Sequence, residues 1–267
     1  MSEIREEVSR DFQLLLSTLG DWRSSLSGLS FESLDDLRWQ GLEMPFEEEV
    51  VYKALLSFRG DKAPGSDGLS TTFWQFLWEI VKNEVMNFFR EFHTSGCFVH
   101  SVNATFLVLI PKKGGVEDLR DFGPISLVGG EVLAKVISKT QNAFVEGRQI
   151  LFAVLIANEV IDSILKSNGG AIQCKLDIEK AYDHVKWSFL FIVMEKMGFW
   201  ERWLRWVKWC LSTVRFYVLV NGTPSGFFQS SRGLRQGDLL SPYLFVIATE
   251  ALSCLLKRAM LSAGKRM

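Results

Sequence analysis

Apolar residues recur along the chain with two different periods. A spacing near 3.6 residues places apolar side chains on one face of a helix, whereas strict alternation places them on one face of a strand. Helical spacing predicts helices over residues 45–58, 71–92, 131–137, 150–165, 187–197 and 201–212, and over a last segment that begins at Ser241 and Pro242. Residues 1–44 are helix-prone at first and then rich in serine, and we interpret them as a leader or linker.

Three segments are predicted to be strands. Residues 104–110 form an apolar, β-prone run that Pro111 ends. Residues 172–177 alternate between apolar and polar positions, so Asp177 stands at the end of this strand on its polar face. Residues 215–220 lead into an Asn-Gly turn, which predicts a hairpin that returns through residues 227–228.

Composition sets bounds on the fold and on the partners. The 267 residues are enough for one large domain or two modest ones, and a hydrophobic content of 48% supports a sizeable core. The formal net charge of −1 argues mildly against nucleic-acid binding, because neutralising phosphates requires Lys and Arg. Basic side chains do cluster locally, at Lys112-Lys113, Arg232 with Arg235, Lys257-Arg258 and Lys265-Arg266.

The sequence also indicates where the protein resides. Four widely spaced cysteines without a Cys-x-x-Cys pair indicate a reduced, intracellular protein of the nucleus or cytoplasm. The acidic, polar amino terminus is not typical of a signal peptide. Residues 239–256 are long and apolar, but Glu250 and Pro242 favour a buried helix over a transmembrane segment. The sequence therefore predicts no membrane association.

Two short segments carry the candidate chemistry. Residues 175–183 read KLDIEKAYD and place Asp177 at a strand end, with Tyr182 just beyond. Residues 233–242 read GLRQGDLLSP and place Gln236 in a glycine-flanked turn ahead of a helix. Taken singly, each residue has a plain structural interpretation, because aspartate caps turns, tyrosine packs in cores and glutamine is common in loops.

Together with five further tracts, these segments resemble the reverse transcriptase domain of plant LINE-type (non-LTR) retrotransposons. The further tracts are EEVVYKALLSFRGDKAPGSDGLS at 48–70, FLVLIPKKG at 106–114, DFGPISL at 121–127, QNAFVEGRQI at 141–150 and LIANEVID at 155–162, in the family's order. The resemblance implies the α+β class: right-hand polymerase fingers and a partial palm, with helices packed on a small antiparallel sheet. It divides the chain into a leader (1–44), a fingers region (45–170) and a partial palm (171–267).

The resemblance also implies the site residues. In this family two Mg²⁺ ions, held by carboxylate oxygens, support the transfer of a deoxynucleotide to a primer. The metal ligands it implies are Asp177, which is also the catalytic carboxylate, and the carbonyl of Ile178. The nucleotide contacts it implies are Tyr182 (a gate against a ribose 2′-hydroxyl), Gln236, Gly237, Lys112 and Lys113. A solvated loop remains the alternative for the two lysines. The implied partners are an RNA template, a DNA primer and deoxynucleoside triphosphates.

The chain departs from the family pattern at two places that bear on activity. The family's last catalytic segment, an aromatic residue, any residue and then Asp-Asp, should follow the helix that Pro242 begins, and the sequence does not contain it. Gly123 stands where the family has an arginine that binds triphosphate. We therefore expect an RNA-directed DNA polymerase domain that is truncated before the Asp-Asp segment and has little or no activity alone.

Two alternatives remain open. The chain can be a non-catalytic product of a decayed element that retains only nucleic-acid or partner binding. An RNA-dependent RNA polymerase or an intron maturase shares the palm arrangement, although the KAPGSDG and QNAFVEGRQI tracts disfavour both. If the palm lacks its last hairpin, its sheet should expose an apolar patch near residues 218–220.

Overall fold

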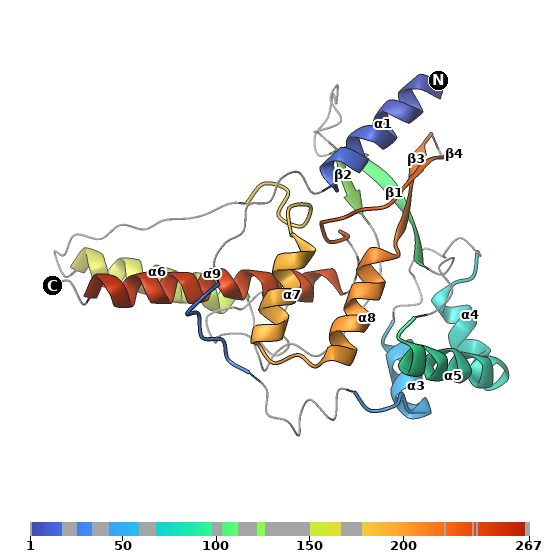
Figure 1. Ribbon diagram of the computed structural model, residues 1–267, viewed down its shortest axis with the longest axis horizontal. Coiled ribbons are helices and arrows are strands. Elements are labelled where there is room, and N and C mark those ends of the chain that lie inside the picture. The colour runs from blue at the N-terminus through green and yellow to red at the C-terminus, as the bar shows by residue number, and fades with distance from the viewer. Residues whose placement is uncertain are drawn as a thin grey trace.

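The computed structural model describes residues 2–17, 26–33, 43–58, 68–97, 103–111, 122–125, 150–166, 178–221, 223–236, 238 and 240–264. Its elements are α1 (Ser2–Leu15), α3 (Glu48–Ser57), α4 (Thr71–Phe76), α5 (Trp78–Ser95), β1 (Ala104–Pro111), β2 (Phe122–Ile125), α6 (Ile150–Lys166), α7 (Trp187–Lys196), α8 (Glu201–Ser212), β3 (Arg215–Val220), β4 (Thr223–Phe228) and α9 (Ser241–Gly264), drawn in Figure 1. The helix predicted over 131–137 and the strand predicted over 172–177 lie outside the described residues.

The sheet is mixed, with the strand order β2-β1-β3-β4. The predicted hairpin of β3 and β4 is confirmed, and β1 also pairs antiparallel with β2, a strand that the apolar spacing did not predict. The prediction of a purely antiparallel sheet is wrong at the centre, where β1 and β3 run parallel. A tight hairpin cannot join parallel strands, and here a long connection that includes α6, α7 and α8 separates them. Helices and a small sheet together confirm the α+β class.

Two local features were not visible in the apolar spacing. The helix predicted over 71–92 is two helices, because Leu77 leaves the helical conformation and ends α4 before α5 begins. Ser70 caps α4 with its hydroxyl, which accepts a hydrogen bond from Phe73 N at 3.3 Å. Strand β2 contains Gly123 and Pro124, two residues that rarely occur inside strands, and its position at the sheet edge tolerates the missing proline N–H.

The largest core lies between α7, α8 and α9; in Figure 1, α7 and α8 stand side by side and run across the direction of α9. The side chains of Leu190, Val193, Met194 and Met197 are completely buried there. The apolar residues whose spacing predicted α7 and α8 thus form the face that each helix turns toward this core.

Helix α1 packs on one face of the sheet and forms a second core. Val8, Phe12 and Leu16 contact Phe216 and Val218 in this core. The predicted exposed patch near residues 218–220 is therefore wrong at Val218, which α1 covers so fully that its exposed fraction is 0%. The first part of the predicted leader contributes to the folded core, whereas the division into leader, fingers and palm stays a prediction.

Helices α3, α4 and α5 form a separate group beside the sheet (Figure 1). Val51, Trp78 and Met86 form a buried cluster within it, and an apolar groove of about 350 Å³ runs along it. In the described ranges, no helix combines the length and the apolar character that crossing a membrane requires.

Candidate functional site

Hydrogen bonds join the two segments that the sequence singled out. The N–H of Gly233 donates to Val185 O at 2.8 Å, and the N–H of Leu234 donates to Tyr182 O at 2.9 Å. The indole Nε1–H of Trp187 donates to Gly233 O at 2.7 Å. The turn of residues 178–186 and the loop of residues 229–236, which we call the glutamine loop, therefore lie side by side.

Gly233 is what permits this close approach. Its φ of +86° lies in the left-handed region, which side chains rarely adopt. A Cβ atom at this position would lie 2.9 Å from Leu16 Cδ2 and 3.2 Å from Asp183 O. Only a residue without a side chain fits between α1 and the turn of residues 178–186.

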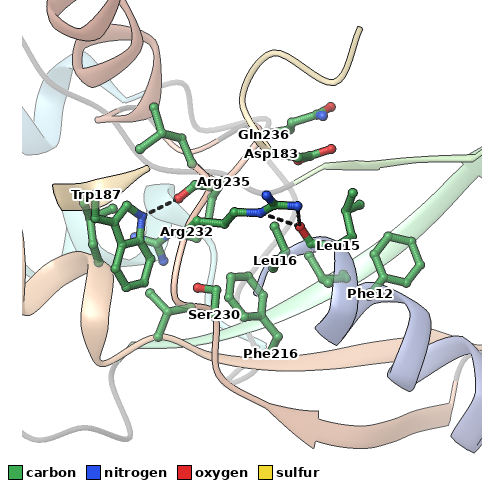
Figure 2. Close-up of a pocket in the computed structure, with 15 residues that line it drawn as sticks. Phe12, Leu15, Leu16, Asp183, Trp187, Phe216, Ser230, Arg232, Arg235 and Gln236 are labelled. Carbon is green, nitrogen blue, oxygen red and sulfur yellow. Dashed lines mark hydrogen bonds between the residues drawn. The ribbon is translucent and has the colours of Figure 1, made fainter. Parts of the chain in front are cut away.

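A narrow cavity of about 30 Å³ lies where α1, this turn and the glutamine loop meet. Figure 2 shows Asp183 and Gln236 at one edge of it, and Phe12 of α1 with Leu16, the residue after α1, at another. Small-molecule sites usually have volumes of several hundred Å³, so this cavity marks a junction rather than a complete nucleotide pocket. Asp183, in this turn, is 5% exposed.

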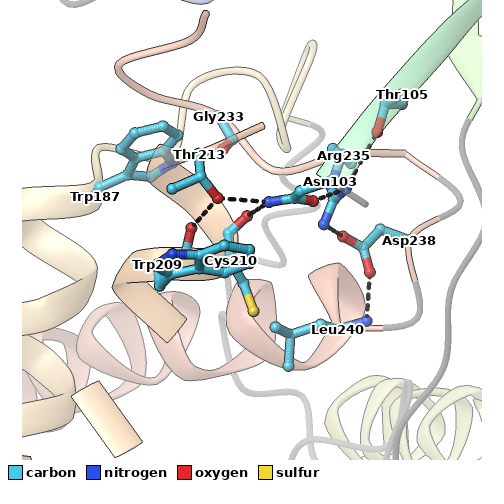
Figure 3. Close-up of polar contacts among 10 residues, drawn as sticks. All are labelled: Asn103, Thr105, Trp187, Trp209, Cys210, Thr213, Gly233, Arg235, Asp238 and Leu240. Carbon is cyan, nitrogen blue, oxygen red and sulfur yellow. Dashed lines mark hydrogen bonds and ion pairs between the residues drawn. The ribbon is translucent and has the colours of Figure 1, made fainter. Parts of the chain in front are cut away.

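Arg235 ties the glutamine loop to two other elements (Figure 3). Its Nη2 lies 2.6 Å from Asp238 Oδ2, and both side chains are largely buried. Its Nη1 donates to Asn103 Oδ1 and to Thr105 Oγ1, each at 3.2 Å. A buried arginine must have such partners, because an unpaired buried charge is costly. Gln236 therefore follows directly after a residue whose position is fixed.

The partners of Arg235 are themselves held by hydrogen bonds. Asn103 Nδ2 donates to Cys210 O and to Thr213 Oγ1, each at 2.9 Å, at the end of α8. Asp238 Oδ1 accepts from Leu240 N at 2.9 Å, just before α9 begins. This network joins the start of β1, the end of α8 and the start of α9.

Tyr182 is half-buried against α9. Its ring meets the ring of Phe245 edge-on, with centroids 4.9 Å apart, and burial raises the pKa of its phenol. The phenol is therefore neutral at physiological pH. Ile178, at the start of the same turn, is 51% exposed.

The predicted site residues divide into two sets. Ile178, Tyr182 and Gln236 lie in the described residues, and the structure brings the segments that carry Tyr182 and Gln236 together. The other predicted residues, Asp177, Gly237, Lys112 and Lys113, lie outside the described residues. Among the described residues, no group of three or more His, Cys, Asp or Glu side chains could hold a metal ion.

Sequence reasoning assigned the wrong environment to two arginines. It took Arg232 and Arg235 as a local basic patch, but Arg232 donates to Leu15 O and Arg235 is paired with Asp238. The Asp three positions after Arg235, inside a glycine-flanked turn, was the available signal for that pair. The contact from Arg232 to α1 is long-range and leaves no such signal.

Comparison with known proteins gives the following similarities. Residues 119–265, more than half of the chain, match the family described as reverse transcriptase (RNA-dependent DNA polymerase). Over 84% of its length, the chain is 27% identical to the transposon TX1 uncharacterized 149 kDa protein of Xenopus laevis. Over 80% of its length, it is 26% identical to a retrovirus-related Pol polyprotein from the type-1 retrotransposable element R2 of Popillia japonica. The chain spans 18% and 31% of these two relatives. A stretch of 46 residues is 61% identical to an uncharacterized mitochondrial protein of Arabidopsis thaliana.

Proposed function

The chain belongs to the reverse transcriptase family, and we propose that it is the RNA-directed DNA polymerase domain of a non-LTR retrotransposon of the plant LINE type. The observation that carries this proposal is the direct bonding of the Tyr182 turn to the glutamine loop. A polymerase needs groups from both segments around one incoming nucleotide, and these bonds hold the two segments at a fixed distance.

In the proposed site, Asp177 and the carbonyl of Ile178 hold a divalent cation. A carboxylate and a carbonyl oxygen are the donors that Mg²⁺ prefers, so the donor set fits this ion. When bound, Mg²⁺ would lower the pKa of the primer 3′-hydroxyl and neutralise charge on the departing pyrophosphate. In the sequence, Asp177 immediately precedes Ile178, which is exposed at the start of the turn that contains Tyr182.

The remaining proposed roles concern the nucleotide. Tyr182, held edge-on by Phe245, crowds the ribose 2′ position and favours deoxynucleotides. The amide of Gln236 contacts the incoming nucleotide, and Gly237 lets the backbone approach it closely. Lys112 and Lys113 contact the triphosphate or template phosphates as point charges. The proposed partners are an RNA template, a DNA primer and deoxynucleoside triphosphates.

We expect the 267 residues to synthesise DNA weakly or not at all by themselves. They contain the first carboxylate segment of the family but no aromatic-x-Asp-Asp segment, so Mg²⁺ would be incompletely held. Gly123, which pairs with Ile110 in the sheet, also lacks the guanidinium that would bind triphosphate. A non-catalytic nucleic-acid-binding product of a decayed element is the second candidate, and the glycine at position 123 favours it.

Primer extension on an RNA template in Mg²⁺ tests the proposal. We expect any extension to require Mg²⁺ and to vanish in Asp177→Asn, while the control Glu179→Gln, at an exposed position of the same turn, extends like the unmodified chain. Extension that persists in Asp177→Asn would contradict the proposal. No extension together with intact binding of the primer-template would favour the non-catalytic candidate.

A further inference from the structure

The carboxyl end of α1 is held by the glutamine loop. The backbone N–H groups of Ser231 and Arg232 donate to Leu16 O at 2.9 and 3.2 Å. The guanidinium of Arg232 donates to Leu15 O from Nε at 2.9 Å and from Nη2 at 2.7 Å, as Figure 2 shows. The last carbonyls of a helix have no partner within the helix, and a cation is favourable there. The loop supplies both the partners and the cation.

A second contact joins the middle of α1 to strand β4 of the hairpin. Ser9 Oγ donates to Ser225 O at 3.4 Å. At the next residue, Gly226, φ is +63° and an added Cβ would collide with the Ser9 side chain. Gly226 and Gly233 thus lie on two different elements, and each lacks room for a side chain because of α1. The helix is therefore fitted closely at its middle, at Ser9, and just beyond its carboxyl end, at Leu16.

Successive residues of the glutamine loop contact α1 and the Tyr182 turn. Ser231 and Arg232 bond to α1, whereas Gly233 and Leu234, the next two residues, bond to the turn. The loop is therefore held by α1 and by the turn shortly before Gln236. Residues of α1 also line the cavity that Gln236 borders.

We propose that Arg232 is a positioning residue that makes α1 a working part of the nucleotide site. Arg232 holds the end of α1 against the glutamine loop, and the loop in turn keeps Gln236 in place for the nucleotide. This inference rests on the proposed role of Gln236. Loss of the contact lets the loop move away from the turn, so nucleotide affinity falls although the cores formed by α7, α8 and α9 stay intact.

Hydrogen exchange of the loop amides, combined with photolabelling by an azido-dATP, tests this inference on the full chain. In Arg232→Ala we expect exchange across residues 229–236 to rise about tenfold or more and the half-saturating azido-dATP concentration to rise several-fold. Arg232→Lys keeps the positive charge and can still donate a hydrogen bond. Its loop exchange and its half-saturating azido-dATP concentration should therefore lie between those of Arg232→Ala and the unmodified chain. Arg10→Ala removes an exposed positive charge from the same helix and should change neither.

A second variant keeps the test decisive if Arg232→Ala does not fold. Gly226→Ala pushes α1 away through Ser9 and leaves Arg232 unchanged, and it should raise loop exchange in the same way. Unchanged loop exchange in both folded variants would overturn the inference. Faster loop exchange with higher half-saturation supports it. Faster loop exchange, when even the unmodified chain is not labelled, supports the contact to α1 and contradicts the proposed function instead.

Discussion

The region around the glutamine loop and the group of α3, α4 and α5 differ in how completely they are packed. In the first region Leu190, Val193 and Met194 are completely buried. The buried ion pair of Arg235 and Asp238 also lies there, and each of its two members makes further hydrogen bonds. In the second region an apolar groove stays open, and Phe76 and Ile80 are 86% and 75% exposed. Fixed geometry is found where the candidate chemistry lies.

This difference shows what apolar spacing can and cannot predict. The spacing is equally clear in both regions, because it records which face of a helix is apolar. It does not record whether another element covers that face. The same limit explains the error at Val218, since the helix that covers it comes from the opposite end of the sequence.

Much of the fold could be predicted from local patterns. The α7 and α8 helices and the β3–β4 hairpin have strong local signals, namely apolar periodicity and an Asn-Gly turn. The break at Leu77, the edge strand with Gly123 and Pro124 and the parallel pairing of β1 with β3 depend on tertiary contacts, so they could not be read locally.

The site was predicted in part. The resemblance indicated that the segments of Tyr182 and Gln236 meet, and the structure brings these segments together. The sequence named Arg232 and Arg235 only as a basic patch, because it does not distinguish a buried cation from a solvated one, and the pairing of Arg235 with Asp238 was overlooked. Four predictions probe the contrast between the two regions, in order of decreasing effect.

Replacing Arg235 with methionine should have the largest effect. Asp238 is 3% exposed, and without its partner it becomes a buried, unpaired charge, so we expect a loss of about 3–5 kcal/mol of unfolding free energy in urea. The control Lys53→Ala removes an ion pair with Glu49 at 2.7 Å that is mostly exposed, so it should leave the unfolding free energy nearly unchanged. Similar losses of unfolding free energy in the two variants would contradict the expected difference in packing between the two regions.

Two matched methionine truncations compare the cores directly. Met194→Ala, in the fully packed core, should cost about 2–5 kcal/mol, because a cavity remains that its neighbours cannot fill. Met86→Ala, in the cluster whose Val51 and Trp78 line the open groove, should cost at least about 1 kcal/mol less, because that cluster can relax. Urea unfolding measures both, and an equal or larger loss at Met86 would refute the expected order.

Thiol labelling distinguishes the regions without substitution. Burial raises the pKa of the Cys210 thiol to about 11, so only about one thiol in a thousand is ionised at pH 8. Cys97, after α5, is exposed. Peptide mapping after N-ethylmaleimide treatment at pH 8 should show Cys97 labelled at least about a hundredfold faster, with Cys210 labelling rising as the pH approaches 11. Equal rates at pH 8 would mean that α8 is open to solvent.

Substitution on the exposed face of α5 should have the smallest effect on stability. Ile80→Gln replaces a side chain that is 75% exposed, so the unfolding free energy should change by about 0.5 kcal/mol or less. Light scattering should detect less self-association, because the exposed apolar area shrinks. A large loss of stability would show that this face is covered after all.

The most direct test of the central claim is to map where a nucleotide binds. The claim is that the Tyr182 turn and the glutamine loop form one nucleotide site. Photolabelling with azido-dATP in Mg²⁺, followed by peptide sequencing, should place the label on peptides containing Tyr182 or Gln236, and excess dATP should suppress it. Label confined to other peptides, or equal labelling of the native and the urea-unfolded chain, would contradict the account.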